Sequence, residues 1–92
     1  MFVGIVPLFD VNAVVLFDSG ATHSFVALSF AQAYKLDLVK DKKGWNISIP
    51  TRVNQIALWV CRRCPISLGH LILPADLIAL DMKGFDVILG MD

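Results

Sequence analysis

The sequence predicts a small, mostly β domain with one helix. Three observations support this prediction: the apolar runs are short, they are separated by Pro, Gly, Asn and Asp, and a single segment has helical periodicity. Many short strands bounded by turn residues are typical of a small barrel or sandwich. A chain of 92 residues has room for one domain, which we expect to span residues 1–92.

The first half of the chain contains two predicted strands and the helix. Residues 2–6 form a short apolar segment that ends at Pro7, which suits an edge strand. Residues 13–17 form a continuous apolar run, typical of a strand that is buried on both faces. Residues 24–36 place apolar side chains at spacings of three and four, which predicts a helix with Ser24 as its N-cap.

The second half is predicted to contain two hairpins and two further strands. The segments WNISIP and QIALWVC, within residues 45–61, form the first hairpin, and PISL and LILP form the second around a turn at Gly69-His70. A further strand, ADLIALD, follows at residues 75–81. After a turn at residues 82–84, the segment FDVILG closes the series as the last strand.

The composition is apolar for a chain of this size. Hydrophobic residues make up 57% of the sequence, and the mean hydropathy is +0.69. Charged residues and prolines interrupt every apolar run before it reaches the roughly 20 residues that cross a membrane. The apolar N-terminal stretch has no basic flank and no small-residue cleavage site, so we expect no signal peptide. We expect an interface with another subunit, and not a membrane, to bury the excess apolar surface.

The charges balance, since eight Lys and Arg face eight Asp and there is no Glu. The local basic segment KDKKG, at residues 40–44, has no interleaved aromatic residues, so we expect a solvated loop and no binding to nucleic acid. We expect an intracellular protein, located in the cytoplasm, whose cysteines remain reduced.

The two cysteines, Cys61 and Cys64, form a CxxC sequence. Such a pair can be half of a zinc site or a redox pair. Zinc would need two more ligands, and the two histidines, His23 and His70, are not at a spacing typical of zinc fingers. A redox pair belongs at a helix N-terminus, whereas Pro65 and the surrounding residues favour strands. We therefore expect two free thiols in or near a strand, and no metal or other cofactor.

Asp18 is the main candidate for chemistry. It directly follows the apolar run VVLF, where burying a carboxylate is costly unless hydrogen bonds hold it. Ser19 and Thr22 offer hydroxyl groups, and Gly20 leaves room for the close approach of a backbone or a substrate. Alternatively, Asp18 simply ends a strand in an Asx turn, with Gly20 at a positive φ. Local chemistry leaves both interpretations open.

Two segments of the chain resemble the motifs of one protease family. LFDSGATHSF, at residues 16–25, resembles the active-site loop of the retropepsins, the aspartic proteases of retroviruses and retrotransposons, in the Asp-Ser-Gly form of Ty3/gypsy-type polyproteins. FDVILGMD, at residues 85–92, resembles the family's second motif, two hydrophobic residues followed by Gly. The order and separation of the two motifs fit the family, and the likeness runs from Val6 to Asp92.

The resemblance implies a fold and a set of site residues. The fold is a small closed β-barrel of the retropepsin type, in which residues 88–90 pack under the Asp18 loop. Asp18 is then the catalytic aspartate, and Ser19 braces the loop of the neighbouring subunit. Gly20 and Ala21 line the substrate cleft.

By position, the hairpin of residues 45–59 corresponds to the flap that covers substrate in this family. Its tip, residues 50–54, contains no Gly and should be stiffer than is usual. We expect Thr51, Arg52 and Val53 in this tip to contact substrate. The family continues past the second motif, so we expect the single domain of residues 1–92 to be truncated at its C-terminus.

The chemistry of this family needs two carboxylates that share one proton and hold a water molecule between them. The chain contains a single Asp-Ser-Gly, so the second carboxylate must come from Asp18 of another copy. The resemblance therefore implies a homodimeric aspartic endopeptidase that hydrolyses a retroelement polyprotein inside a retroelement particle. The alternative is a catalytically inactive relic that acts as a dimerisation or interaction module.

Overall fold

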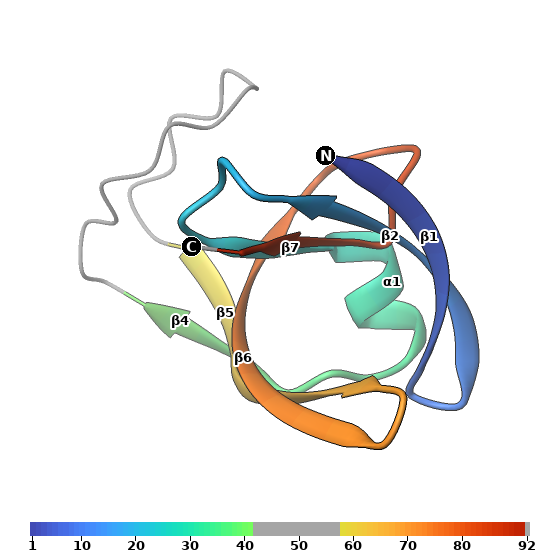
Figure 1. The fold of residues 1–92 in the computed structure, drawn as a ribbon. Coiled ribbons are helices and arrows are strands. Elements are labelled where there is room, and N and C mark those ends of the chain that lie inside the picture. Colours follow the sequence, from blue (N-terminus) through green and yellow to red (C-terminus); the bar gives the residue numbers. More distant parts are fainter. Residues whose placement is uncertain (42–57, 92) are drawn as a thin grey trace.

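The computed structural model describes residues 1–41 and 58–91. These residues form a seven-stranded sheet in the order β1-β2-β7-β3-β6-β5-β4, together with one short helix, α1 (Figure 1). The sheet curves into a half-barrel, with β1 and β4 at its two edges. The prediction of a mostly β fold with one helix is confirmed, whereas closure of the barrel remains a prediction.

The elements alternate with short turns along the described chain. The strands are β1 (Phe2–Leu8), β2 (Val11–Asp18), β3 (Ser24–Ala27), β4 (Leu38–Asp41), β5 (Leu58–Leu68), β6 (Leu71–Leu80) and β7 (Val87–Gly90), and helix α1 is Leu28–Ala33. β1 is an edge strand, as predicted, but it continues through Pro7, which lies opposite Asn12 of β2. Proline is tolerated there because an edge strand can leave one N–H position unpaired.

The β1–β2 hairpin turns at Phe9 and Asp10, both of which have positive φ angles of 53° and 64°. Two-residue hairpin turns commonly require this conformation at both positions, and Asn-Gly is the usual solution. Here the ring of Phe9 packs against Phe30 of α1, with 6.2 Å between the ring centroids. A tertiary contact therefore accompanies a turn that local preferences do not favour.

The predicted helix of residues 24–36 is wrong at both ends, since α1 spans only Leu28–Ala33 and Lys35 has a φ of 54°. Residues 24–27 form β3, which lies between β7 and β6, and the helix begins only at Leu28 with Ala27 as its N-cap. Ser24 is therefore not an N-cap. Phe25 and Val26 are both buried, in different apolar clusters, so β3 is covered on both faces. This burial outweighs the helical periodicity of the segment.

Between residues 58 and 80, the segments predicted as several short strands form two long strands, β5 and β6. The turn at Gly69-His70 is confirmed, and β5 and β6 pair on both sides of it. Their pairing shifts register between Cys61 and Cys64, and Arg63 in this bulge has a φ of 52°. A bulge increases the local twist and bends a strand, which allows β5 to follow the curved sheet. The first predicted hairpin lies largely outside the described residues.

The core consists of two apolar clusters. The larger one joins buried residues of β1, β2, β3, α1, β5, β6 and β7: Leu8, Ala13, Val15, Val26, Ala27, Phe30, Ala31, Cys61, Cys64, Ile66, Leu77, Ala79, Val87 and Leu89. The smaller cluster consists of Phe25, Val60, Ile78 and Leu80. Within the described residues, no helix is long and apolar enough to cross a membrane.

Candidate active site

The site is built where β7 is inserted between two strands that precede it in the chain. β7 runs parallel to β2, with Asp18 opposite Gly90, and antiparallel to β3, with Ile88 opposite Phe25. The chain leaves β2 at Asp18, crosses the end of β7 and returns as β3 at Ser24 (Figure 1). Residues 19–23 therefore form a loop over the C-terminal end of β7, which we call the Asp18 loop.

Asp18 is held at both its side chain and its backbone. Its Oδ1 accepts a hydrogen bond from the Gly20 N–H at 3.0 Å. Its carbonyl oxygen accepts the N–H groups of Ala21, at 3.2 Å, and Met91, at 3.3 Å. Among the described residues, no ion pair involves Asp18. The half-buried carboxylate is thus oriented by backbone amides rather than by a cation.

Gly90 lies directly beneath the Asp18 loop. A Cβ atom at this position would be 2.6 Å from the Ala21 carbonyl oxygen and 2.7 Å from that of His23, closer than real Cβ contacts. The Gly90 N–H also donates a hydrogen bond to Ser24 Oγ at 3.0 Å. The close passage that the resemblance implied for residues 88–90 is therefore present, and it requires glycine at position 90.

The other residues expected in the loop have different surroundings. Ser19 and Gly20 are exposed, so this side of the loop is open to solvent. Gly20 is not among the glycines with positive φ, and a Cβ there would make an ordinary contact of 3.5 Å with Asp18 Oδ1. Thr22 Oγ1 lies 2.9 Å from His23 Nδ1. The bracing role of Ser19 remains a prediction.

Of the expected substrate-binding residues, the structure describes Ala21. It is half-buried, its N–H binds the Asp18 carbonyl, and its own carbonyl faces Gly90. Its predicted contact with substrate remains untested. Thr51, Arg52 and Val53 lie outside the described residues.

Two apolar residues lie near Asp18: Leu16, which the sequence analysis did not name as part of the site, and Ile88, which the resemblance placed in the segment under the loop. Side chains alternate along a strand, so Leu16 lies on the same face of β2 as Asp18. The register places Ile88 of β7 next to Leu16, and both side chains are half-buried. The two-residue spacing of Leu16 from Asp18 was available in the sequence, whereas the position of Ile88 required the strand register. The carboxylate thus lies beside an apolar surface.

The comparisons with known proteins agree with this geometry. A family model described as retroviral aspartyl protease matches residues 1–92. The chain belongs to the retroviral aspartyl protease family. No curated protein matches the chain.

The retropepsin-like fold is also found in a solved structure, that of the retroviral protease-like domain of Ddi1 from Leishmania major. The match has a TM-score of 0.61 and 18% sequence identity, and it covers 98% of this chain and 73% of that chain. At this level of identity, the likeness shows a shared fold.

At the other end of β7, this retropepsin-like chain has a second acidic residue, Asp86, with several backbone partners. Asp86 Oδ2 accepts the Val14 N–H at 2.8 Å, and the Asp86 N–H donates to the Val14 carbonyl oxygen at 2.8 Å. The Asp86 carbonyl oxygen accepts the Ala27 N–H, also at 2.8 Å. Asp86 therefore connects β7 to both β2 and β3, and no local pattern in the sequence indicates this.

An apolar cavity of about 360 Å³ lies close to the loop but does not contain the candidate carboxylate. Its lining residues are Phe17, Ser24, Ile66, Leu68, Leu73, Pro74, Ala75, Leu89, Gly90 and Met91. Asp18 is not among them, although its chain neighbour Phe17 and its register partner Gly90 are. The cavity is therefore not where an Asp18 carboxylate would act.

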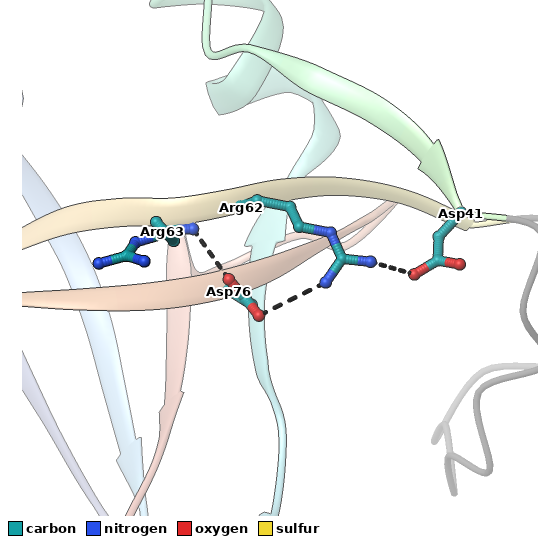
Figure 2. Close-up of polar contacts among 4 residues, drawn as sticks. All are labelled: Asp41, Arg62, Arg63 and Asp76. Atoms are coloured by element: carbon teal, nitrogen blue, oxygen red, sulfur yellow. Dashed lines mark hydrogen bonds and ion pairs between the residues drawn. The ribbon is translucent and has the colours of Figure 1, made fainter.

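A separate cluster of charges lies across β4, β5 and β6, as Figure 2 shows. Arg62 contacts the buried Asp41 at 2.6 Å and Asp76 at 3.7 Å. Asp76 Oδ1 also accepts the backbone N–H of Arg63 at 2.8 Å. The cluster ties the β5 bulge to both neighbouring strands, so we interpret it as structural.

The two cysteines are free and buried, which confirms two free thiols in a strand. In a regular strand, residues three apart face opposite sides, but the bulge brings Cys61 and Cys64 into the same apolar cluster. Burial raises the pKa of the Cys64 thiol to about 12, and the hydrogen bond and charge of Cys61 add to this shift. A thiol with this pKa stays protonated and is a poor nucleophile or metal ligand. The described residues contain no group of three or more side chains that could hold a metal ion.

Proposed function

We propose that the chain is one half of a homodimeric aspartic endopeptidase, in which Asp18 of each copy supplies one catalytic carboxylate. One observation carries the proposal: the Asp18 carboxylate is oriented by the Gly20 N–H in a loop whose close passage over β7 requires Gly90. Membership of the retroviral aspartyl protease family supports the class of enzyme. The exposed Ser19 and Gly20 leave one side of the loop open to a second copy.

The proposed mechanism follows from the proximity of two like charges. Two adjacent carboxylates cannot both ionise readily, so the pair shares a proton. The ionised carboxylate takes a proton from a water molecule, and that water attacks the carbonyl carbon of the substrate. The protonated carboxylate donates its proton to the carbonyl oxygen. The tetrahedral intermediate then collapses: the carboxylate that took a proton from water passes it to the leaving nitrogen, a hydroxyl group of the intermediate returns a proton to the other carboxylate, and the C–N bond breaks.

We further propose that the substrate is a retroelement polyprotein of the Ty3/gypsy type, processed in a cytoplasmic particle. Leu16 and Ile88 beside Asp18 favour apolar side chains next to the cleaved bond. Thr51, Arg52 and Val53 would contact the same substrate from the covering hairpin.

Asp18→Asn tests the catalytic role. Asparagine keeps an oxygen that can accept the Gly20 N–H, so the loop should keep its shape, but asparagine cannot accept a proton from water. We expect cleavage of a polyprotein-derived peptide to fall about 10³-fold or more. Asp10→Asn is the matched control, because Asp10 also follows a Phe at the end of an apolar segment but lies in an exposed turn. Cleavage that survives in Asp18→Asn at the wild-type rate would refute the assignment.

The dimer has a test of its own. Sedimentation over a concentration series should show a monomer–dimer equilibrium, and cleavage per mole of chain should fall on dilution along with the dimer fraction. Full activity in a purely monomeric sample would contradict the sharing of carboxylates between copies.

A non-catalytic dimerisation module is the second candidate. The sequence feature that favours it is the absence of Gly from residues 50–54, the tip of the hairpin that would cover substrate, whereas the Gly20 N–H bond to Asp18 fits both functions because it shapes the loop whether or not the carboxylate reacts. This function predicts dimers without cleavage, and unchanged dimerisation in Asp18→Asn. Any cleavage that is lost in Asp18→Asn would exclude it.

A further inference from the structure

β7 is attached to its neighbours at both ends. At the end under the Asp18 loop, the Met91 N–H binds the Asp18 carbonyl and the Gly90 N–H binds Ser24 Oγ. At the opposite end, three hydrogen bonds of 2.8 Å join Asp86 to Val14 and Ala27. β2 and β3, the two strands that carry the Asp18 loop, are therefore joined through β7 at each of its ends.

The side chain of Asp86 takes the place of a backbone group. In a longer β7, the Val14 N–H would bind a carbonyl oxygen of an earlier β7 residue. The chain instead turns away before the strand, where Gly84 has a φ of 91°. The Asp86 carboxylate accepts the Val14 N–H in this position, while the N–H and carbonyl of Asp86 bind β2 and β3. Without a carboxyl or amide oxygen here, the Val14 N–H would have no such acceptor.

These contacts set the register on which the candidate site depends. Val14 lies four residues before Asp18, and Asp86 lies four residues before Gly90. When Val14 is paired with Asp86, Asp18 therefore lies opposite Gly90. A slip of one residue would move Leu89 or Met91 under the loop. Position 90 has no room even for a Cβ atom, so either side chain would displace the loop.

We propose that Asp86 is a positioning residue: by binding Val14 and Ala27 it sets the register that places the Asp18 carboxylate over Gly90. The kinetic part of this proposal rests on the proposed protease function. The structural part, the link between Asp86 and the geometry of the Asp18 loop, is independent of that function.

Two conservative substitutions separate geometry from charge. Asp86→Asn loses the charge but keeps an oxygen at the same distance from the backbone, so we expect kcat to stay within about threefold of wild type. Asp86→Glu keeps the charge but moves the carboxylate outward by one methylene, so we expect a loss of about 10- to 100-fold in kcat with little change in KM. The opposite order, an active Asp86→Glu and an inactive Asp86→Asn, would overturn the proposal.

Leu8→Val is the control for general destabilisation. Leu8 is buried next to the turn of the β1–β2 hairpin, at the opposite end of β2 from Asp18. Shortening its side chain should lower the global stability but leave kcat unchanged. If Leu8→Val lowers kcat as much as Asp86→Glu does at equal stability, Asp86 has no specific positioning role and the proposal fails.

Amide hydrogen exchange gives a readout that does not need catalysis. The N–H groups of Ala21 and Met91, which both bind the Asp18 carbonyl, should exchange about tenfold faster in Asp86→Glu and at the wild-type rate in Asp86→Asn. If no variant cleaves peptide, wild type included, the proposed function fails while this comparison still decides the role of Asp86. Equal exchange in the two variants would refute that role.

Discussion

Asp18 and Asp41 each end a strand, β2 and β4 respectively, but they are held in different ways. Asp41 is buried, and its contacts include the Arg62 guanidinium at 2.6 Å (Figure 2). Asp18 is half-buried and is oriented by the Gly20 N–H, with no ion pair among the described residues. Asp41 pairs with a cation of its own chain, whereas Asp18 pairs with none among residues 1–41 and 58–91.

The difference indicates what each carboxylate can do. Removing a cation that contacts a buried carboxylate is costly, so the Arg62 contact contributes to the stability of the region around Asp41. A carboxylate held by a backbone amide can share a proton with a second carboxylate, because no adjacent cation competes for its charge. We therefore interpret the Asp41 region as structural, and the proposed chemistry concerns the Asp18 region.

The largest expected effect concerns the glycine under Asp18. Gly90→Ala would place a Cβ atom 2.6–2.7 Å from two carbonyl oxygens, so the loop must move, and we expect a loss of about 3 kcal/mol in the free energy of unfolding and a loss of cleavage. Urea unfolding and a peptide cleavage assay would measure the two effects.

Gly20→Ala is the matched comparison for Gly90→Ala. Its Cβ would make only a 3.5 Å contact with Asp18 Oδ1, so unfolding should change by less than about 0.5 kcal/mol. A loss of cleavage in this stable variant would place the requirement for Gly20 in the second chain or the substrate. A destabilisation equal to that of Gly90→Ala would show that both glycines serve the fold of a single chain.

The next largest effect is expected for Arg62→Ala, which tests the structural role of the Asp41 region. Arg62→Ala removes the guanidinium group that contacts the buried Asp41, and we expect a loss of about 1–2 kcal/mol in the free energy of unfolding. The loss should not be larger, because the Arg62 side chain is 49% exposed and solvent screens the ion pair. Arg63→Ala removes the same charge but keeps the backbone N–H that binds Asp76, so it should change stability much less. Equal effects of the two substitutions would argue against a specific ion pair.

The smallest effect concerns the buried thiol of Cys64. The pKa of Cys64 rises from 9.0 to about 12 on folding, so above pH 9 the unfolded chain releases a proton that the folded chain keeps. This contribution to stability is present below pH 9 and is lost as the pH rises towards 12. We expect wild type to lose about 1 kcal/mol between pH 8 and pH 10 relative to Cys64→Ala, measured by urea unfolding. Parallel pH curves for the two proteins would contradict the shift.

Several elements could be predicted from local sequence because their signals are local. The apolar runs of β1, β2 and β7 are bounded by turn residues, and Gly69, at a φ of 64°, marks the β5–β6 turn. β3 could not be predicted in the same way. Its four residues look like the start of a helix, and they become a strand because Phe25 and Val26 are buried on opposite faces between β7 and β6.

The residues of the candidate site also fall into two groups: those that the local sequence indicates and those that depend on the pairing of distant strands. Asp18 is recognisable from its position after an apolar run and before Ser-Gly, and the resemblance to a protease family adds Gly90. Leu16 and Asp86 become relevant only through the parallel register of β2 and β7, and the same register places Ile88 next to Leu16. These residues pair although they are 70 or more positions apart in the chain, so no local spacing in the sequence predicts the contact.

Short apolar runs, turn residues and the two short motifs, all properties of neighbouring residues, were enough to predict a mostly β domain and to single out Asp18 as a candidate catalytic residue. The insertion of β7 between β2 and β3 was decided only in the folded chain. The reason is physical: the Asp86 carboxylate, the Val14 and Ala27 N–H groups and the space beneath the Asp18 loop must fit together at once. Such a fit depends on contacts between distant segments, and these contacts hold Gly90 under Asp18.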